Sequence, residues 1–153
     1  MDHRERATAL FMEGYSCAQA VFGAFADVTG LDFDTAMRLA SSFGAGMGRM
    51  REVCGTCSGM FMVLGLLFGH SDADPQKKAA VYARVQDLAA RFRERSGTIV
   101  CRELLRGIKA DTRPMPDART AEYYRIRPCV RFVADAAEIL DEYLTENGIS
   151  AGK

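Results

Sequence analysis

The stretch that decides the fold is "CGTCSGMFMVLGLLFG", residues 54–69, in which a Cys-x-x-Cys pair leads directly into an apolar run. The run from 60 to 68 is about half as long as the roughly 20 residues that a membrane-spanning helix needs, so it predicts a buried helix. Apolar residues cover all faces of a helix over about 53–68, which is typical of a helix that others surround. We therefore expect a central helix here.

Hydrophobic residues recur at helical spacing on both sides of this segment. Six further helices are expected: one ending at Gly14, one over 17–28, one capped by Asp32 and ending before Gly44, one from Asp72 or Asp74 through Phe92, one over 100–106 and one from Pro128 to Asn147. Ser16 and Asp32 are suitable N-caps. Residues 107–118 should form the longest loop, and no alternating strand pattern persists over five residues. The sequence predicts one all-α domain, residues 1–153, a helical bundle wrapped around the central apolar helix.

The charge balance excludes several classes of partner. Twenty basic and twenty acidic residues cancel, so no overall field favours nucleic acid or an anionic membrane. The first residues, "MDHRERATALFMEG", lack the long apolar region and cleavage site of a signal peptide. We therefore expect a cytoplasmic protein with reduced thiols. A homodimer is compatible with the many apolar positions.

The cysteines are the candidate functional residues: Cys17, Cys54, Cys57, Cys101 and Cys129. Each falls near the start of an expected helix, where the helix dipole and free backbone N–H groups favour a thiolate. Arginines that would also lower a thiol pKa stand close in sequence: Arg49 and Arg51 before Cys54, Arg102 after Cys101, and Arg127 and Arg131 around Cys129. The alternative is that the cysteines are small core residues. The isolated His3 and His70 are expected to be solvated.

Four stretches together resemble a known family: "GYSCAQAVFGAF" (14–25), "FGAGMGRMREVCGTCSGMFMVLGL" (43–66), "CRELL" (101–105) and "CVRFVADAAEIL" (129–140). They are similar to the C-GCAxxG-C-C family of redox proteins, which are small, helical and characterised by four cysteines. The resemblance implies that the family cysteines are Cys17, Cys54, Cys101 and Cys129. The chain departs from the family's CGAxxG motif at Thr56, which replaces the alanine, and at Cys57, which occupies a variable position.

Two functions of different class follow. The first is a thiol–disulfide redox protein in which Cys54 attacks and Cys57 or a distant cysteine resolves the mixed disulfide. It needs no cofactor, and its partner is a thiol or disulfide substrate or a redox protein. The second is a zinc or iron–sulfur protein whose ligands are the four family cysteines. A helical interaction module whose cysteines only pack is a third interpretation.

Overall fold

The regular secondary structure of residues 1–150, the part of the chain that the computed structural model describes, is entirely helical, so the predicted all-α class is confirmed. The elements are α1 (His3–Met12), α2 (Cys17–Ala24), α3 (Ala26–Thr29), α4 (Phe33–Ala40), the 3-10 turn η1 (Ser41–Phe43), α5 (Gly44–Met47), α6 (Gly55–Phe68), α7 (Pro75–Ser96), α8 (Cys101–Leu104), α9 (Ala121–Ile126) and α10 (Cys129–Glu146). The single domain predicted over 1–153 also includes residues 151–153, which lie outside the described residues.

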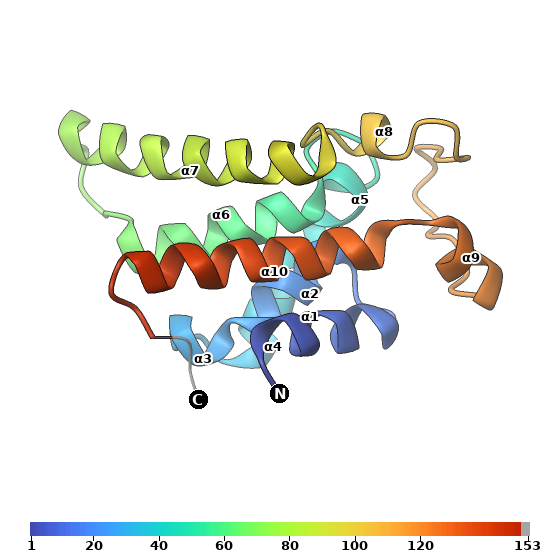
Figure 1. Cartoon of the computed structure of the whole chain (residues 1–153), viewed down its shortest axis with the longest axis horizontal. Coiled ribbons are helices and arrows are strands. Elements are labelled where there is room, and N and C mark those ends of the chain that lie inside the picture. Colours follow the sequence, from blue (N-terminus) through green and yellow to red (C-terminus); the bar gives the residue numbers. More distant parts are fainter. Residues whose placement is uncertain (151–153) are drawn as a thin grey trace.

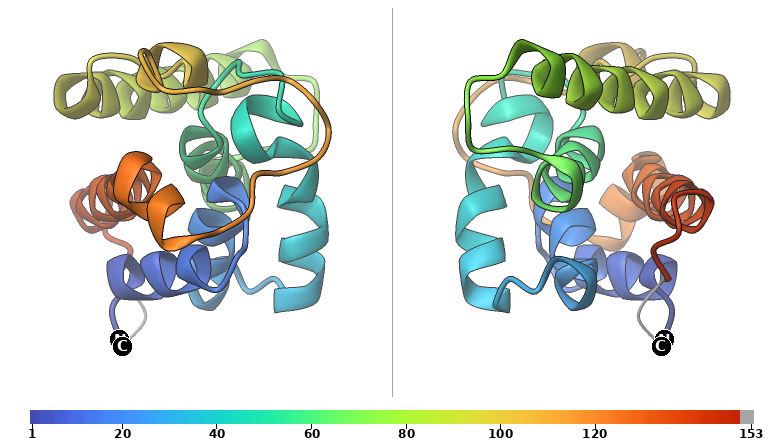
Figure 2. Two further views of the ribbon diagram at one scale, coloured as in Figure 1. Left: turned by 90° about the vertical axis from the view of Figure 1, so that its right-hand side faces the viewer. Right: turned by 90° about the vertical axis from the view of Figure 1, so that its left-hand side faces the viewer.

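The long helices form layers around a shared apolar core. α7 lies along one side of the molecule, α6 and α10 pack beneath it, and α1 and α2 pack on the far side of α10 (Figure 1). α4 flanks α2 at the edge of the bundle (Figure 2). The short helices α5, α8 and α9 lie toward the end of the molecule where α6 begins, whereas α3 lies away from them (Figure 1).

Close packing between α2 and α6 brings two helix starts together. Gly59 lies so near α2 that a Cβ built on it would stand 3.0 Å from the Cβ of Val21 and 3.1 Å from the carbonyl oxygen of Ala18. Gly55 lies equally close to the first turn of α2. A Cβ at Gly59 would make contacts tighter than nine in ten Cβ contacts, and one at Gly55 would stand closer to the Cys17 sulfur than Cβ atoms approach, so the two glycines let the helix backbones meet. Cys17 and Cys54 therefore belong to adjacent helix starts.

The burial of α6 is graded along its length. Residues 55–60 are all buried, and Val63 and Leu64 are inaccessible to solvent. Leu66 is 49% exposed, so the expectation that α6 is enclosed on every face is wrong for its C-terminal end. In residues 1–150, no helix combines the length and the apolarity required to cross a membrane.

Two local features differ from the expected elements. The helix expected over 17–28 ends at Ala24, because Phe25 leaves the helical region at φ −100° and ψ 16°, and α3 follows as a separate turn. α9 was not expected, because six residues without a clear apolar stripe carry little periodic signal. Of the caps, Ser16 and Asp32 are confirmed, each accepting a hydrogen bond from a backbone N–H of the first turn.

His3 is 2% exposed, so the expectation of a solvated residue is wrong. Its Nδ1 lies 2.6 Å from a carboxylate oxygen of Asp141 on α10, and its Nε2 lies 2.9 Å from one of Asp27 on α3. Burial lowers the pKa of His3, but the hydrogen bonds to Asp141 and Asp27 outweigh burial, and the net pKa is raised. The imidazole thus links α1 to two other helices.

Candidate functional site

A cavity of about 320 Å³ lies at the end of the bundle where α2, α6, α8 and α10 begin. Four cysteines far apart in the sequence line it: Cys17, Cys54, Cys101 and Cys129. α2, α8 and α10 begin at Cys17, Cys101 and Cys129, and Cys54 is the N-cap of α6. Cys57, one turn into α6, is fully buried and does not line the cavity. The four cysteines that the resemblance singles out thus share one cavity.

Cys54 is the acidic thiol of the site. Its pKa is lowered to about 7, chiefly because the Cys57 thiol donates a hydrogen bond to its sulfur, although burial opposes the shift. The hydroxyl of Thr56 lies 3.1 Å from the Cys54 sulfur and also favours the thiolate, as do the backbone N–H groups of Thr56 and Cys57. A thiolate is the nucleophilic form of cysteine, and a pKa of about 7 leaves a substantial fraction of Cys54 in that form near neutral pH.

Cys57 is the protonated partner of Cys54. Its pKa is raised well above the ordinary value because its hydrogen bond to Cys54 and its burial both disfavour the charged form. Cys54 is the N-cap of α6, with ψ 133°, and Cys57 lies three residues further on, in the first turn of that helix. All five cysteines are free thiols.

The other three cavity thiols are held neutral. Burial is the largest cause in each case, and it raises the pKa of Cys17 to about 12 and that of Cys129 to about 11. The pKa of Cys101 is raised as well, despite a hydrogen bond from Arg51 that lowers it. The expectation that every helix start would promote a thiolate is therefore wrong for these three, because burial outweighs the neighbouring groups that favour the charged form.

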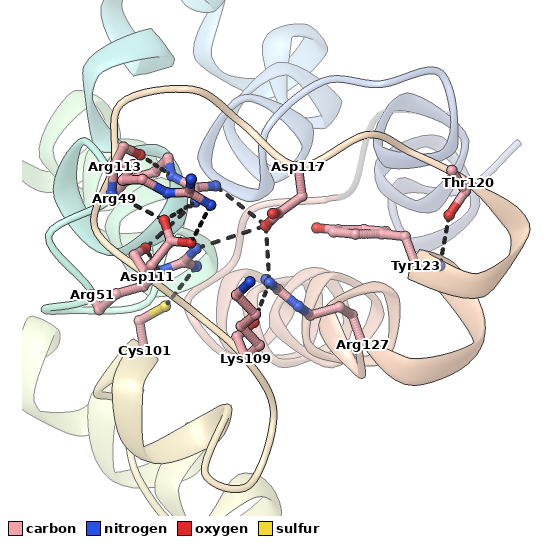
Figure 3. Close-up of polar contacts among 10 residues, drawn as sticks. All are labelled: Arg49, Arg51, Cys101, Lys109, Asp111, Arg113, Asp117, Thr120, Tyr123 and Arg127. Atoms are coloured by element: carbon pink, nitrogen blue, oxygen red, sulfur yellow. Dashed lines mark hydrogen bonds and ion pairs between the residues drawn. The ribbon is translucent and has the colours of Figure 1, made fainter.

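Three buried arginines converge beside the thiols. Figure 3 shows the guanidinium groups of Arg49, Arg51 and Arg127 around the carboxylate of Asp117. The Oδ2 of Asp117 lies 3.3 Å from Nη1 of Arg49, 2.9 Å from Nη2 of Arg127 and 4.0 Å from Nη2 of Arg51. Arg49 also donates to Asp111, 3.0 Å away. The loop that follows α8 supplies both carboxylates, so it forms one wall of the site.

The arginines act on a different cysteine from the one expected. Arg49 and Arg51 were expected to activate Cys54, but Arg51 reaches Cys101, with 3.8 Å between Nη1 and Sγ, and Arg49 is engaged with Asp111 and Asp117. Cys54 instead depends on Cys57 and Thr56. Asp111 and Asp117 were not among the residues expected at the site. The available signal was their place in the longest loop, since long ordered loops are often functional.

A left-handed turn presents the two arginines. Ala45, Gly46, Met47, Gly48, Arg49 and Arg51 all have positive φ, between 54° and 75°. For residues other than glycine this region costs about 1–2 kcal/mol each, and such strain concentrates at functional sites. A Cβ on Gly46 would stand 2.6 Å from the Cα of Arg51 and 2.7 Å from the Cβ of Cys101. The turn therefore brings its own backbone directly against Cys101, the first residue of α8.

The thiols as placed do not form a metal-ion site. Among residues 1–150, which include all five cysteines, no group of three or more His, Cys, Asp or Glu side chains could hold one metal ion. The arrangement instead supplies one acidic thiol, one hydrogen-bonding thiol and three neutral thiols near fixed positive charge.

A family model described as "Putative redox-active protein (C_GCAxxG_C_C)" matches residues 15–143. The matched region runs from the residue before the Ser16 cap of α2 to the last turn of α10, and so contains every cysteine of the site. No curated protein and no solved structure matches the chain.

Proposed function

The chain belongs to the C_GCAxxG_C_C family, and from this premise we propose that it is a thiol–disulfide redox protein in which the Cys54 thiolate attacks. The observation that carries the proposal is the pKa of Cys54, lowered to about 7 while burial raises the pKa of Cys17, Cys101 and Cys129. Five free thiols suit a reducing compartment, so we place the reaction in the cytoplasm.

The first step is attack on a substrate disulfide. The Cys54 sulfur forms a bond to one substrate sulfur, the substrate S–S bond breaks, and the second substrate sulfur leaves as a thiolate with the electron pair. A mixed disulfide between Cys54 and the substrate results. Optimum attacking thiols have a pKa near the ambient pH, as that of Cys54 does.

Cys57 resolves the mixed disulfide in the second step. Cys57 is the largest cause of the lowered pKa of Cys54, whereas Cys17 and Cys129 are affected by Cys54 only through its charge. Its sulfur attacks that of Cys54, its proton passes to the departing substrate sulfur, and a Cys54–Cys57 disulfide remains. Two electrons have then moved from the protein to the substrate, and a dithiol reductant restores both thiols.

Two variants test the proposal with bis(2-hydroxyethyl) disulfide, a small neutral substrate. Cys54→Ser should abolish its reduction, because a hydroxyl is not a nucleophile at this pH. Cys57→Ser should accumulate the mixed disulfide, a mass increase on Cys54 that peptide mass spectrometry locates. Ser58→Ala, a buried change on the same helix that does not line the cavity, is the folding control. Full activity of Cys54→Ser would overturn the assignment.

A second candidate is a zinc or iron–sulfur site whose ligands are Cys17, Cys54, Cys101 and Cys129, favoured by their shared cavity. The side chains would have to move to bind a metal ion, because no three of the described ligand groups are grouped for one. Native mass spectrometry of protein purified without oxygen distinguishes the two candidates. A stoichiometric zinc, or iron with sulfide, would replace the redox proposal.

A further inference from the structure

The charged groups that line the cavity are strongly unbalanced. Four guanidinium groups, those of Arg49, Arg51, Arg119 and Arg127, face the single lining carboxylate of Asp117. A partly enclosed site lined by one sign of charge raises the local concentration of oppositely charged ligands. The volume of about 320 Å³ falls within the range of small-molecule pockets.

Most of these guanidinium groups are engaged within the protein. Arg119 donates to the backbone carbonyls of Phe11 and Tyr15, at 2.8 and 2.9 Å. Arg127 donates through Nη2 to the carbonyl of Lys109, at 2.7 Å, as well as to Asp117. These two arginines hold the walls of the cavity together.

Arg51 is different, because one of its donors has no acceptor. The residue is 3% exposed, its Nε donates to the carbonyl of Asp111, and its Nη1 contacts the Cys101 sulfur. Its Nη2 is buried and makes no hydrogen bond, with the Asp117 carboxylate 4.0 Å away as its nearest ion-pair partner. A buried charged donor without an acceptor is unfavourable. The geometry therefore indicates that an acceptor from outside the chain completes this group.

We infer that the cavity binds a carboxylate of the substrate through Nη2 of Arg51, so that the preferred substrates are small disulfides and thiols that carry carboxylates. This inference rests on the proposed function, since it names the substrate class of the same site. The cavity holds both elements of recognition: Cys54 for the sulfur and Arg51 for the negative group. A hydrogen bond from a guanidinium N–H to a carboxylate is charge-assisted, and so it is stronger than one between neutral groups.

The test compares three disulfides of different charge: glutathione disulfide, which carries carboxylates, neutral bis(2-hydroxyethyl) disulfide and cationic cystamine. Arg51→Gln should lower kcat/KM for glutathione disulfide about tenfold or more, the value of a hydrogen bond to a charged group. The ratio of kcat/KM for glutathione disulfide to kcat/KM for the neutral disulfide should fall as well. Arg102→Gln is the matched control, because Arg102 is one residue from Cys101 but pairs with Glu52 outside the cavity.

A binding measurement separates this inference from the proposed function. S-methylglutathione carries the carboxylates but cannot exchange, and calorimetry should show that it binds Cys54→Ser and not Arg51→Gln. Such binding without any disulfide reduction by the wild type would overturn the redox proposal and keep the carboxylate site. Equal kcat/KM for the three disulfides, or an Arg51→Gln variant that binds S-methylglutathione as the wild type does, would overturn the carboxylate site.

Discussion

The sulfur of Cys17 packs directly against the backbone of Gly55, the residue that follows Cys54, so closely that a Cβ built on Gly55 would overlap it. The same Cβ would stand 3.0 Å from the backbone nitrogen of Ala18. The glycine after Cys54 is thus what allows the thiols of α2 and α6 to share one cavity.

Gly55→Ala should destabilise the fold by about 1–3 kcal/mol, because a methyl group there overpacks the first turn of α2. Gly65→Ala is the matched control on the same helix. Nothing lies within 4 Å of a Cβ at Gly65, so alanine should stabilise the helix by about 0.5–1 kcal/mol. Urea denaturation gives both values, and adding Cys17→Ala to Gly55→Ala should recover part of the loss. Equal stability of the Gly55→Ala variant and the wild type would contradict this packing.

Cys57→Ala should raise the pKa of Cys54 above its value of about 7, because the variant loses the thiol that donates to the Cys54 sulfur. The loss of a hydrogen bond to a charged group predicts a rise of about one to two units. Cys57→Ser keeps a donor and should leave the pKa of Cys54 nearer to the wild-type value. The pH dependence of Cys54 alkylation by iodoacetamide, followed peptide by peptide, measures the pKa in all three proteins. Identical profiles would show that Cys57 does not stabilise the thiolate.

The His3 contacts should make stability depend on pH. Burial lowers the pKa of His3, but its hydrogen bonds to Asp141 and Asp27 raise the net pKa in the folded state. The contribution of His3 to the free energy of unfolding is therefore complete below the unfolded pKa of about 6.5, and it is lost as the pH rises through the folded pKa. The decline cannot exceed about 1.4 kcal/mol per pH unit for one proton. Urea denaturation between pH 5 and 9 gives the free energy of unfolding of the wild type and of His3→Gln. The difference between the two curves is the contribution of His3. Parallel curves for the two proteins would refute the role of this histidine.

Gly46→Ala should disturb the cavity more than Gly48→Ala. Both glycines have positive φ, so both variants carry similar backbone strain. Only at Gly46 would a Cβ meet the backbone of Arg51 and the Cβ of Cys101, whereas at Gly48 the nearest atom is 3.6 Å away. Gly46→Ala should therefore lose about 1–3 kcal/mol more stability, and alkylation of Cys101 should become faster as α8 shifts. Equal losses in the two variants would mean that the close approach has no energetic weight.

The helices of the bundle were predictable because their signals are local. Ser16, Asp32 and Asp74 each accept a hydrogen bond from the first turn of a helix, and apolar spacing marks the long helices that follow. The break at Phe25 was not predictable, because it is a change in backbone torsion within an apolar segment. His3 was missed for another reason: Asp27 and Asp141, which hold it, are distant in the sequence.

The candidate site was predictable only in part. The spacing of Cys54 and Cys57 predicted a shared helix face; in the structure Cys54 is the N-cap of α6, Cys57 lies in the first turn, and Cys57 is the largest cause of the lowered pKa of Cys54. Arg51 was expected to act on Cys54 because the two are close in sequence. In the structure the left-handed turn over 45–51 precedes a contact of Arg51 with Cys101 instead. No local pattern indicates that Asp117 meets three arginines, since that contact exists only in the folded chain.

The walls of the cavity come from segments widely separated along the polypeptide. Arg49 meets Asp111 and Asp117 across 62 and 68 residues, and Arg51 meets Cys101 across 50. Closing such long loops lowers the entropy of the chain, and this cost is offset only when the contacts of the site have formed. This end of the molecule should therefore assemble late in folding. The same separation means that no short peptide taken from the chain reproduces the site. A designer who wants this chemistry in another scaffold would have to transplant the tertiary arrangement, since the CGTCSG sequence alone would carry only its first turn.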